Sequence, residues 1–207
     1  MEKGLTYSGP EPAHTAAYLQ RPLLEELGPL SGKTLLDIGC GNGALSASLA
    51  GRGAQVVGID LSPSGITIAR EKYPELEWSV MSAYDDLKSR LSREFDLVVC
   101  LEIIEHLFDP RLFLRRAFDV LRPGGSLVLS TPYHGYLKNV ALALSGRLDA
   151  HFTVLGDGGH IKFFSRRTLQ TLLEETGFAD LRFRGAGRLP FLWKSMVVSA
   201  RRPNSQA

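Results

Sequence analysis

Short apolar runs alternate along this chain with segments in which apolar side chains recur at every third or fourth position. The runs at 55–59 and 95–100 are almost entirely apolar, which is typical of strands in a parallel sheet that is covered on both faces. The helical period is clearest over 109–121 and 165–177. Together these patterns predict strands at 35–38, 55–59, 76–80, 95–100, 126–130, 181–184 and 195–200.

Capping side chains mark the points where several predicted helices begin. Asp109-Pro110 and Ser62-Pro63 each place a capping side chain before a proline that suits the first helical turn, and Ser165 opens the last helix. We therefore predict helices at 13–21, 22–27, 44–52, 62–73, 109–121 and 165–177, with Pro22 opening a new turn and the pair 124–125 turning the chain into the following strand.

The order of these elements specifies the fold class. Strands that alternate with helices predict an α/β, Rossmann-like doubly wound sheet of seven strands with helices on both faces. The last two strands have no helix between them, so one of them is expected to be an antiparallel edge strand. We interpret residues 1–207 as a single domain, with an N-terminal helical cap at 1–30 and an insertion or lid at 133–160.

Composition narrows the class of protein further. A hydrophobic fraction of 44% and a charged fraction of 22% are those of a globular protein, and a net charge of +2 with scattered basic residues indicates no nucleic-acid partner. We find no apolar run long enough to span a bilayer and no signal-peptide pattern, so a cytoplasmic monomer or homodimer is expected. Cys40 and Cys100 lack metal-ligand or redox spacing and are interpreted as packing residues.

The first strand runs into a glycine turn, and the second ends in a carboxylate. The turn has the sequence Asp-Ile-Gly-Cys-Gly-Asn-Gly from Asp37 onward, and the second strand leads to Asp60. Gly39, Gly41 and Ala44 alone would also fit a dinucleotide fingerprint. A carboxylate two residues before the first glycine, however, would repel a pyrophosphate and suits a ligand that carries positive charge there. The pair of acids therefore favours a cationic nucleoside such as S-adenosylmethionine.

With this motif the chain resembles the class I S-adenosylmethionine-dependent methyltransferases over about residues 30–200. The resemblance implies that Asp37 holds the methionine amino group, directly or through water, and that Asp60 accepts hydrogen bonds from the ribose hydroxyls. It also implies a seven-stranded sheet with one strand reversed. The cofactor-binding residues expected on these grounds are Asp37, Gly39, Cys40, Gly41, Asn42, Gly43, Asp60, Leu61, Ser82, Ala83, Leu101 and Glu102.

The segment after the third strand departs from the family pattern. Members commonly carry an acid followed by a small residue there, against the adenine, and this chain has Ser82 in place of the acid. The side-chain contact with the adenine amino group is therefore open, although Asp85 is close in sequence and backbone contacts from Ala83 remain available.

Two histidine-bearing segments resemble those of the ubiquinone-biosynthesis O-methyltransferases and related small-molecule enzymes. They are residues 100–110, with His106, and residues 158–165, with His160, and we expect one of these histidines to be the general base. A structural role for His106 is the alternative. Glu102, Glu105 and His106 also resemble a divalent-metal site proposed for some quinone methyltransferases, but two acids are few for a hard cation and no metal ligand is assigned.

The reaction expected is methyl transfer to an oxygen, less readily to a nitrogen or carbon, of a small-molecule acceptor such as an aromatic or quinone precursor. The alternatives are a nicotinamide-dependent reductase, for which the only Tyr-x-x-x-Lys spacing is Tyr84 to Lys88, and a non-catalytic cofactor-binding protein of the same fold. Apolar positions on one helical face within 136–155 predict a lid over the acceptor, a peripheral membrane contact, or a helix packed on the core.

Overall fold

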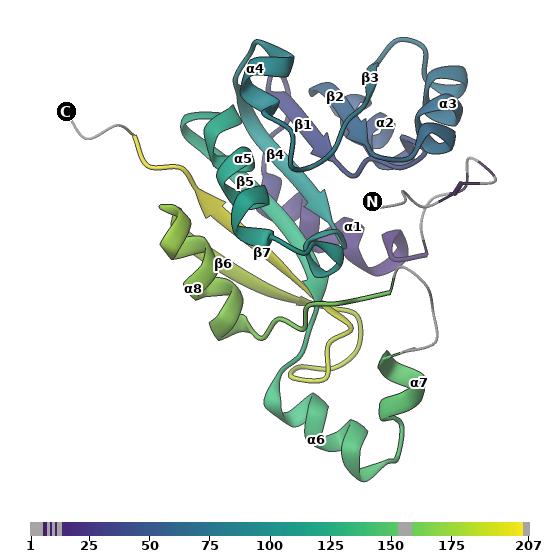
Figure 1. Ribbon diagram of the computed structural model, residues 1–207, viewed down its shortest axis with the longest axis vertical. Helices are drawn as coiled ribbons and strands as arrows, with labels where there is room; N and C mark the ends of the chain where they lie inside the picture. Colours follow the sequence, from purple (N-terminus) through teal and green to yellow (C-terminus); the bar gives the residue numbers. More distant parts are fainter. Residues whose placement is uncertain (1–5, 8, 10, 12–13, 153–158, 205–207) are drawn as a thin grey trace.

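A seven-stranded sheet forms the centre of the computed structural model, which describes residues 6–7, 9, 11, 14–152 and 159–204 (Figure 1). Its strand order is β3-β2-β1-β4-β5-β7-β6. The strands are β1 (Thr34–Ile38), β2 (Gln55–Asp60), β3 (Glu77–Val80), β4 (Phe95–Leu101), β5 (Leu121–Pro132), β6 (Ala179–Ala186) and β7 (Ser195–Arg201). The predicted α/β, Rossmann-like doubly wound fold is confirmed.

The antiparallel pairing at one side of the sheet involves the last two strands, as expected. Strands β1 to β5 pair in parallel, while β7 pairs antiparallel with both β5 and β6. The reversed strand is therefore β7, one place in from the edge, and β6 is the edge strand itself. β7 is buried at every residue but the last, which fits a strand with a partner on each side.

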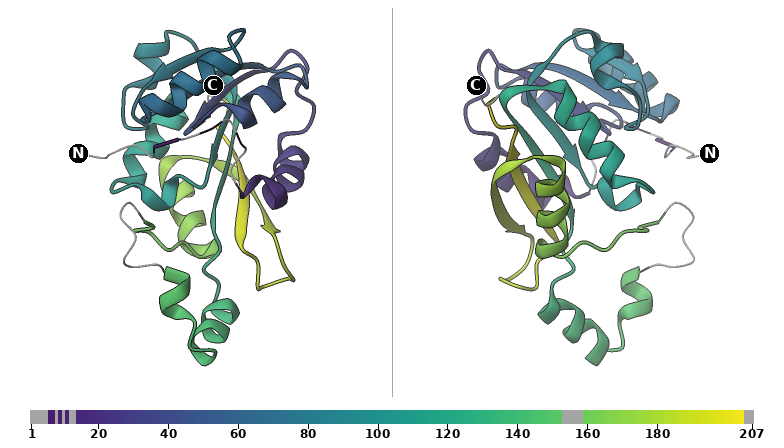
Figure 2. Two further views of the ribbon diagram at one scale, coloured as in Figure 1. Left: turned by 90° about the vertical axis from the view of Figure 1, so that its right-hand side faces the viewer. Right: turned by 60° about the vertical axis from the view of Figure 1, so that its left-hand side comes forward.

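Helices cover both faces of the sheet (Figure 2). One apolar cluster joins α1 and α2 to one face, and a larger one joins α5 and α8 to the other face. Alternate strand residues supply the two clusters, since successive side chains of a strand point to opposite faces. The helices are α1 (Ala16–Leu27), α2 (Ala44–Ala50), α3 (Pro63–Lys72), α4 (Leu87–Leu91), α5 (Pro110–Val120), α6 (Tyr136–Leu144), α7 (Leu148–Phe152) and α8 (Arg166–Thr176), with a 3-10 turn, η1, at Ile104–His106.

Two predicted boundaries are wrong. α1 continues through Pro22 as one helix, because Leu19, Leu23 and Leu27 form a single buried stripe that outweighs the one backbone hydrogen bond proline removes. Leu121 does not end the fifth helix but begins β5, in extended conformation opposite Phe95, so the strand starts before the expected turn. The short helix α4 was not predicted.

The insertion between β5 and α8 projects beyond the sheet, with α6 and α7 at its tip (Figure 1). The apolar face predicted for α6 is exposed rather than packed on the core, as Leu137 is 55% and Leu144 is 85% accessible. Of the residues expected to extend this surface, Val154 and Leu155 lie outside the described residues. Within the part of the chain that the structure describes, no helix is both long and apolar enough to cross a membrane.

Candidate active site

The predicted site residues gather at the carboxyl ends of the parallel strands. From β1 the chain builds the sheet outward through β2 and β3, and then returns to the other side of β1 with β4 and β5. Strand order therefore reverses between β1 and β4, which is the position where open α/β sheets bind their ligands.

The glycine turn closes tightly onto the end of β2. The backbone amides of Gly39 and Cys40 both donate to the carbonyl of Ile59, at 2.8 and 3.1 Å. Gly39 has a φ of 81°, and a Cβ built there would lie 2.5 Å from the Cδ1 of Ile103. Only glycine fits this position, because both the backbone conformation and the approach of the β4 segment exclude a side chain.

Asp60 lies at the tip of β2, beside the glycine turn. Its Oδ2 accepts from the amide of Gly41 at 2.8 Å, and its Oδ1 accepts from the amide of Ser62 at 2.7 Å. Burial raises the pKa of Asp60, and these backbone hydrogen bonds oppose the increase. Each oxygen keeps a second lone pair, so the carboxylate could accept a ribose diol while its backbone bonds hold it in place.

Asp37 lies beneath the turn rather than on its surface. Its side chain is 1% accessible and its Oδ2 accepts from the hydroxyl of Ser46 in α2 at 2.6 Å. Burial raises the pKa of Asp37 to about 7, and the charge of Asp60 contributes to the increase. A contact between Asp37 and the cofactor stays a prediction, and the buried position favours action through the turn or a water rather than a direct ion pair.

The remaining residues of the predicted cofactor set have different surroundings. Asn42 directs its amide nitrogen away from β1 to the carbonyls of Gly9 and Glu11, at 2.9 and 2.8 Å. Cys40 is buried against α3, and burial raises the pKa of its thiol. Gly43 adopts a left-handed conformation, with a φ of 79°, directly before α2. Binding of the cofactor by these residues stays a prediction.

On the side expected for the adenine, the loop after β3 is held by its own hydrogen bonds. The hydroxyl of Ser82 accepts from the amide of Tyr84 at 3.2 Å, and Asp85 pairs with Arg90 and accepts from the amide of Ser82. Asp85 is thus engaged within its loop and does not replace the missing acid in this state. Leu61 and Ala83 are partly buried at the ends of β2 and β3.

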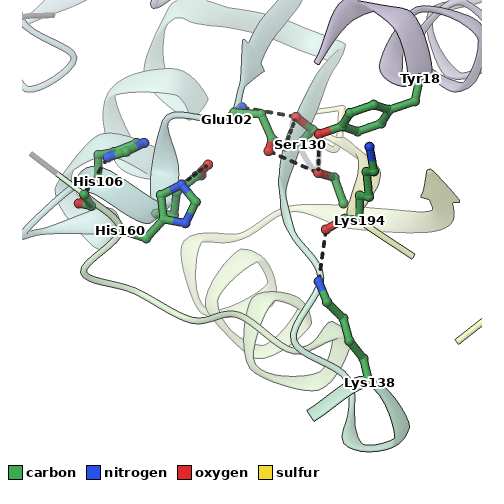
Figure 3. A network of polar contacts seen from close by, with 10 residues as sticks. Tyr18, Glu102, His106, Ser130, Lys138, His160 and Lys194 are labelled. Atoms are coloured by element: carbon green, nitrogen blue, oxygen red, sulfur yellow. Dashed lines mark hydrogen bonds and ion pairs between the residues drawn. The ribbon is translucent and has the colours of Figure 1, made fainter. Parts of the chain in front are cut away.

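Glu102 directly follows Leu101, the last residue of β4, and is fixed by neighbouring strands (Figure 3). Its φ of 54° is unusual for a residue with a side chain. Oε1 accepts from the hydroxyl of Ser130 in β5 at 2.7 Å, and Oε2 accepts from that of Ser195 in β7 at 3.1 Å. Tyr18 of α1 extends the network, with its hydroxyl 3.4 Å from that of Ser195. Burial raises the pKa of Glu102, and both serines oppose this increase.

A second group joins Glu105 to the two predicted bases. The amides of Ile161 and Lys162 donate to the backbone carbonyl of Glu105, at 2.9 and 3.0 Å, and this docking brings His160 beside η1. The rings of His106 and His160 lie 4.8 Å apart, and Nε2 of His160 is 4.0 Å from Oε1 of Glu105. The sequence predicted both histidines, and the structure brings them together.

Glu105 is the unusual member of this group, because its side chain is fully buried. Within the described part of the chain, neither carboxylate oxygen receives a hydrogen bond of normal geometry. Burial raises the pKa of Glu105 well above its usual value, the charge of Glu102 adds to this, and the nearby Thr131 hydroxyl opposes it. Burial and the charge of His106 lower the pKa of His160, so His160 is neutral near pH 7.

Side-chain atoms of Glu105, His106 and His160 lie within 4.8 Å of one another and could hold a divalent cation. Glu102, which the sequence had grouped with Glu105 and His106, is not part of this cluster. Its carboxylate is turned to Ser130 and Ser195 instead.

Sequence reasoning missed the residues that surround Glu102. Ser130, Ser195 and Tyr18 come from three elements far apart in the chain, and none belongs to a motif. Lys138 of α6 is 5% accessible, and its ammonium donates to the carbonyl of Lys194 at 3.3 Å (Figure 3). Burial lowers the pKa of Lys138 to about 8. A lysine that flanks the predicted apolar helical face was the one available signal.

Comparison with known proteins gives the family. Residues 13–182 match the family described as a methyltransferase domain. The chain belongs to this family of class I S-adenosylmethionine-dependent methyltransferases. Among its curated relatives, the ubiquinone biosynthesis O-methyltransferase of Aromatoleum aromaticum is 30% identical over 184 residues, which cover 87% of this chain and 78% of the relative. The enzyme of the same name from Pseudomonas paraeruginosa is 37% identical over 126 residues, and that match spans 58% of this chain and 53% of the relative.

Solved methyltransferase structures share the fold. An S-adenosylmethionine-dependent methyltransferase from Mesorhizobium loti superimposes with a TM-score of 0.70 at 22% identity, covering 88% of this chain and 96% of that one. The residues present fit the family's cofactor. The turn has no side chain at Gly39, and Asp60 keeps acceptor capacity at the end of β2.

Proposed function

We propose that this protein transfers a methyl group from S-adenosylmethionine to an oxygen of a small-molecule acceptor of the phenol or catechol class, such as a quinone precursor. The observation that carries the proposal is the position of the Glu105, His106 and His160 cluster. Glu105 and His106 lie on the segment that follows β4, and the segment before α8 docks His160 against them. Ile103, on the same segment as Glu105, packs directly on Gly39 of the cofactor turn. The names of the curated relatives support an aromatic acceptor.

Bound S-adenosylmethionine supplies a methyl group that is already activated by its sulfonium. The chain then has to hold the acceptor oxygen in line with that methyl, exclude water and remove one proton. His160 is neutral near pH 7 and half-exposed, so it can take the proton of a phenol. The Glu105 carboxyl lies 4.0 Å away and would stabilise the imidazolium only in its ionised form, which its raised pKa opposes. His106 is the alternative base or orients His160 through their ring contact.

The same cluster could instead hold a divalent cation that binds the acceptor oxygens. Two imidazoles and one carboxylate suit a transition metal better than magnesium or calcium, which prefer oxygen ligands. Titration of protein stripped with a chelator against zinc, manganese and magnesium tests this. If methyl transfer keeps its full rate after chelation, the cluster does not act through a metal and its role as a general base remains.

Two experiments separate this proposal from the alternatives, which are a nicotinamide-dependent reductase and a non-catalytic cofactor-binding protein. Calorimetric titration should show binding of S-adenosylhomocysteine and none of NADH, and binding of NADH alone would reject the proposal. An acceptor screen with methyl-labelled cofactor then distinguishes an enzyme from a non-catalytic binding protein of the same fold. Labelled product with catechols or other phenols is the expected result, and transfer only to amines would contradict the acceptor class.

We further propose that residues 136–155 of the 133–160 insertion contact a membrane surface near the acceptor side. Tyr136, Leu137, Val140 and Leu144 form an exposed apolar face on α6. Such a face supports binding of acceptors that partition into lipid. Sedimentation with liposomes of phosphatidylglycerol should carry the protein down, and Leu144→Glu should leave it in the supernatant. Wild-type protein that stays in the supernatant would contradict the membrane contact.

A further inference from the structure

Three described residues near the N-terminus contact the cofactor turn or the start of α3. Asn42, within the turn, donates two hydrogen bonds from its side-chain amide, to the carbonyls of Gly9 and Glu11. At Tyr7 the backbone amide donates to the hydroxyl of Ser64 in the first turn of α3, at 3.0 Å. The segment is therefore fastened on both sides of the turn. We call Tyr7, Gly9 and Glu11 the strap.

The ring of Tyr7 fills the surface that two glycines leave open. A Cβ built at Gly41 would lie 2.5 Å from the Tyr7 hydroxyl, and one built at Gly65 would lie 3.0 Å from its Cδ2. Gly41 and Gly65 thus allow the ring to lie flush against the turn and the start of α3. Gly41 is also the residue whose amide binds Asp60.

Charge at this position keeps the Tyr7 phenol protonated. Burial raises the pKa of Tyr7 to about 12, and the negative charges of Asp60 and Asp37 contribute to the increase. A phenol that stays protonated remains a hydrogen-bond donor. It adds no negative charge to a site that already contains two acids.

We propose that Tyr7 is a cofactor-binding residue and that the strap closes over the nucleoside of S-adenosylmethionine beside Asp60. The inference rests on the proposed cofactor site and adds a residue that the glycine motif does not contain. The aromatic ring supplies apolar cover at the edge of a ligand bound along Gly41 and Asp60, and the strap has to open before the demethylated product can leave.

A contact that only stabilises the ligand-free fold is the simplest alternative, and a plug that competes with the cofactor is the other. The two alternatives and the proposal predict different effects of removing the ring. Loss of a fold contact leaves the affinity unchanged. Loss of a plug raises the affinity, and loss of a cofactor contact lowers it.

The test uses full-length Tyr7→Ala and Tyr7→Phe with S-adenosylhomocysteine as the probe. Affinity is measured by calorimetry, and the dissociation rate by rapid mixing with excess unlabelled ligand. Tyr136→Ala is the matched control, because Tyr136 is 81% accessible on α6, away from the turn. Hydrogen exchange of the peptide that covers residues 6–11 reports closure of the strap without any enzymatic turnover.

We expect Tyr7→Ala to bind about tenfold more weakly and to release the ligand about tenfold faster, as loss of one buried aromatic contact implies. Tyr7→Phe should lie between Tyr7→Ala and wild type, and Tyr136→Ala should match wild type. Ligand should slow exchange over residues 6–11 in wild type. Unchanged or tighter binding by Tyr7→Ala, or faster hydrogen exchange over residues 6–11 when the ligand binds, would overturn the proposed role of Tyr7 and the strap. Failure of wild type to bind the ligand would instead overturn the proposed function.

Discussion

Two groups of buried polar side chains lie at the carboxyl ends of the strands, one expected to bind the cofactor and one expected to bind the acceptor. They differ in how many hydrogen bonds their carboxylates accept. On the cofactor side, Asp60 accepts two backbone hydrogen bonds and Asp37 accepts one from Ser46, all within a short stretch of chain. On the acceptor side, Glu105 is fully buried with no hydrogen bond of normal geometry from the described residues, and His160 approaches it only to 4.0 Å.

The difference indicates that the group around Asp60 is formed before a ligand binds, whereas the group around Glu105 is completed by a ligand. Unpaired buried carboxylates are costly, so a chain that keeps one has a use for it when a partner arrives. On the side proposed for the cofactor the groups are held in place before binding. On the side proposed for the acceptor, burial raises the pKa of Glu105, and a proton, a cation or the acceptor itself has to satisfy its carboxyl group.

The largest expected effect lies on the acceptor side. His160→Ala should lower the rate of methyl transfer to an identified phenol about a thousandfold if His160 is the base, because proton removal by a positioned side chain contributes about that much. His106→Ala should cost less. Affinity for S-adenosylhomocysteine should stay at the wild-type value in both variants, as measured by calorimetry.

His14→Ala is the control for these variants, since His14 is exposed and belongs to neither histidine segment predicted for the site. Full activity in both His106→Ala and His160→Ala would show that neither imidazole removes the proton. Glu105→Gln separates the two roles of the carboxylate. It should shift the pH profile of the rate if Glu105 supports an imidazolium, and it should abolish any dependence on added metal if Glu105 is a ligand.

On the cofactor side, Asp60→Ala should weaken binding of both S-adenosylmethionine and its demethylated product about a hundredfold. The loss corresponds to two charge-assisted hydrogen bonds to the ribose. Asp60→Asn should lose less, because one carbonyl oxygen remains. Calorimetry with Glu71→Gln as an exposed control on α3 measures this, and unchanged affinity in Asp60→Ala would contradict the ribose assignment.

The same contrast explains what the sequence could predict. The cofactor side is built by glycines and acids that are close in sequence, and local backbone geometry requires each of these residue types at its position. Gly39 is required by a positive φ and by Ile103, and Asp60 by the two amides beside it. Local requirements of this kind produce a recognisable sequence motif, so the fold and the position of the cofactor side could be predicted from the sequence.

The polar groups around Glu102 and Glu105 are assembled from residues that are distant in sequence. Glu102 meets Ser195 across 93 residues, and Tyr18 meets the same serine across 177. No spacing rule connects them, and Glu102 was grouped with Glu105 and His106 because that pattern resembles a metal site of quinone methyltransferases. The continuity of α1 through Pro22 was also missed, because local propensity was overruled by a buried stripe that exists only after packing.

Smaller effects of opposite sign should appear in the pH dependence of stability. Asp37 is more protonated when folded than when unfolded, because burial raises its pKa to about 7 from 3.8. Its contribution to stability is therefore full below about pH 4 and is lost as the pH rises through 7. The free energy of unfolding of wild type minus that of Asp37→Asn should fall by about 3 kcal/mol over this range, measured with urea at each pH. Glu71→Gln should give a flat difference, and a flat difference for Asp37→Asn would contradict the buried carboxylate.

His134 should give the opposite slope on the acceptor side, and the smallest effect. It is 7% accessible among Phe152, Phe163 and His151, and burial and the charge of Lys138 lower its pKa to about 4 from 6.5. The unfolded chain binds this proton more readily between those values, so the contribution of neutral His134 to stability is present above pH 6.5 and is lost as the pH falls to 4.

His134→Phe keeps the aromatic packing and removes the titration. Relative to this variant, wild type should lose about 1 kcal/mol of stability between pH 7 and 4, because solvent screening of a partly solvated ring reduces the roughly 3 kcal/mol that the full pKa shift implies. Over the same range wild type gains stability relative to Asp37→Asn. The charges of Lys138, His151 and His160 remain in both proteins, so the difference isolates His134. His14→Phe should show no such slope. If His134→Phe and wild type lose stability in parallel on acidification, the surroundings of His134 do not hold it neutral. The opposite pH dependences expected for Asp37 and His134 would then not exist.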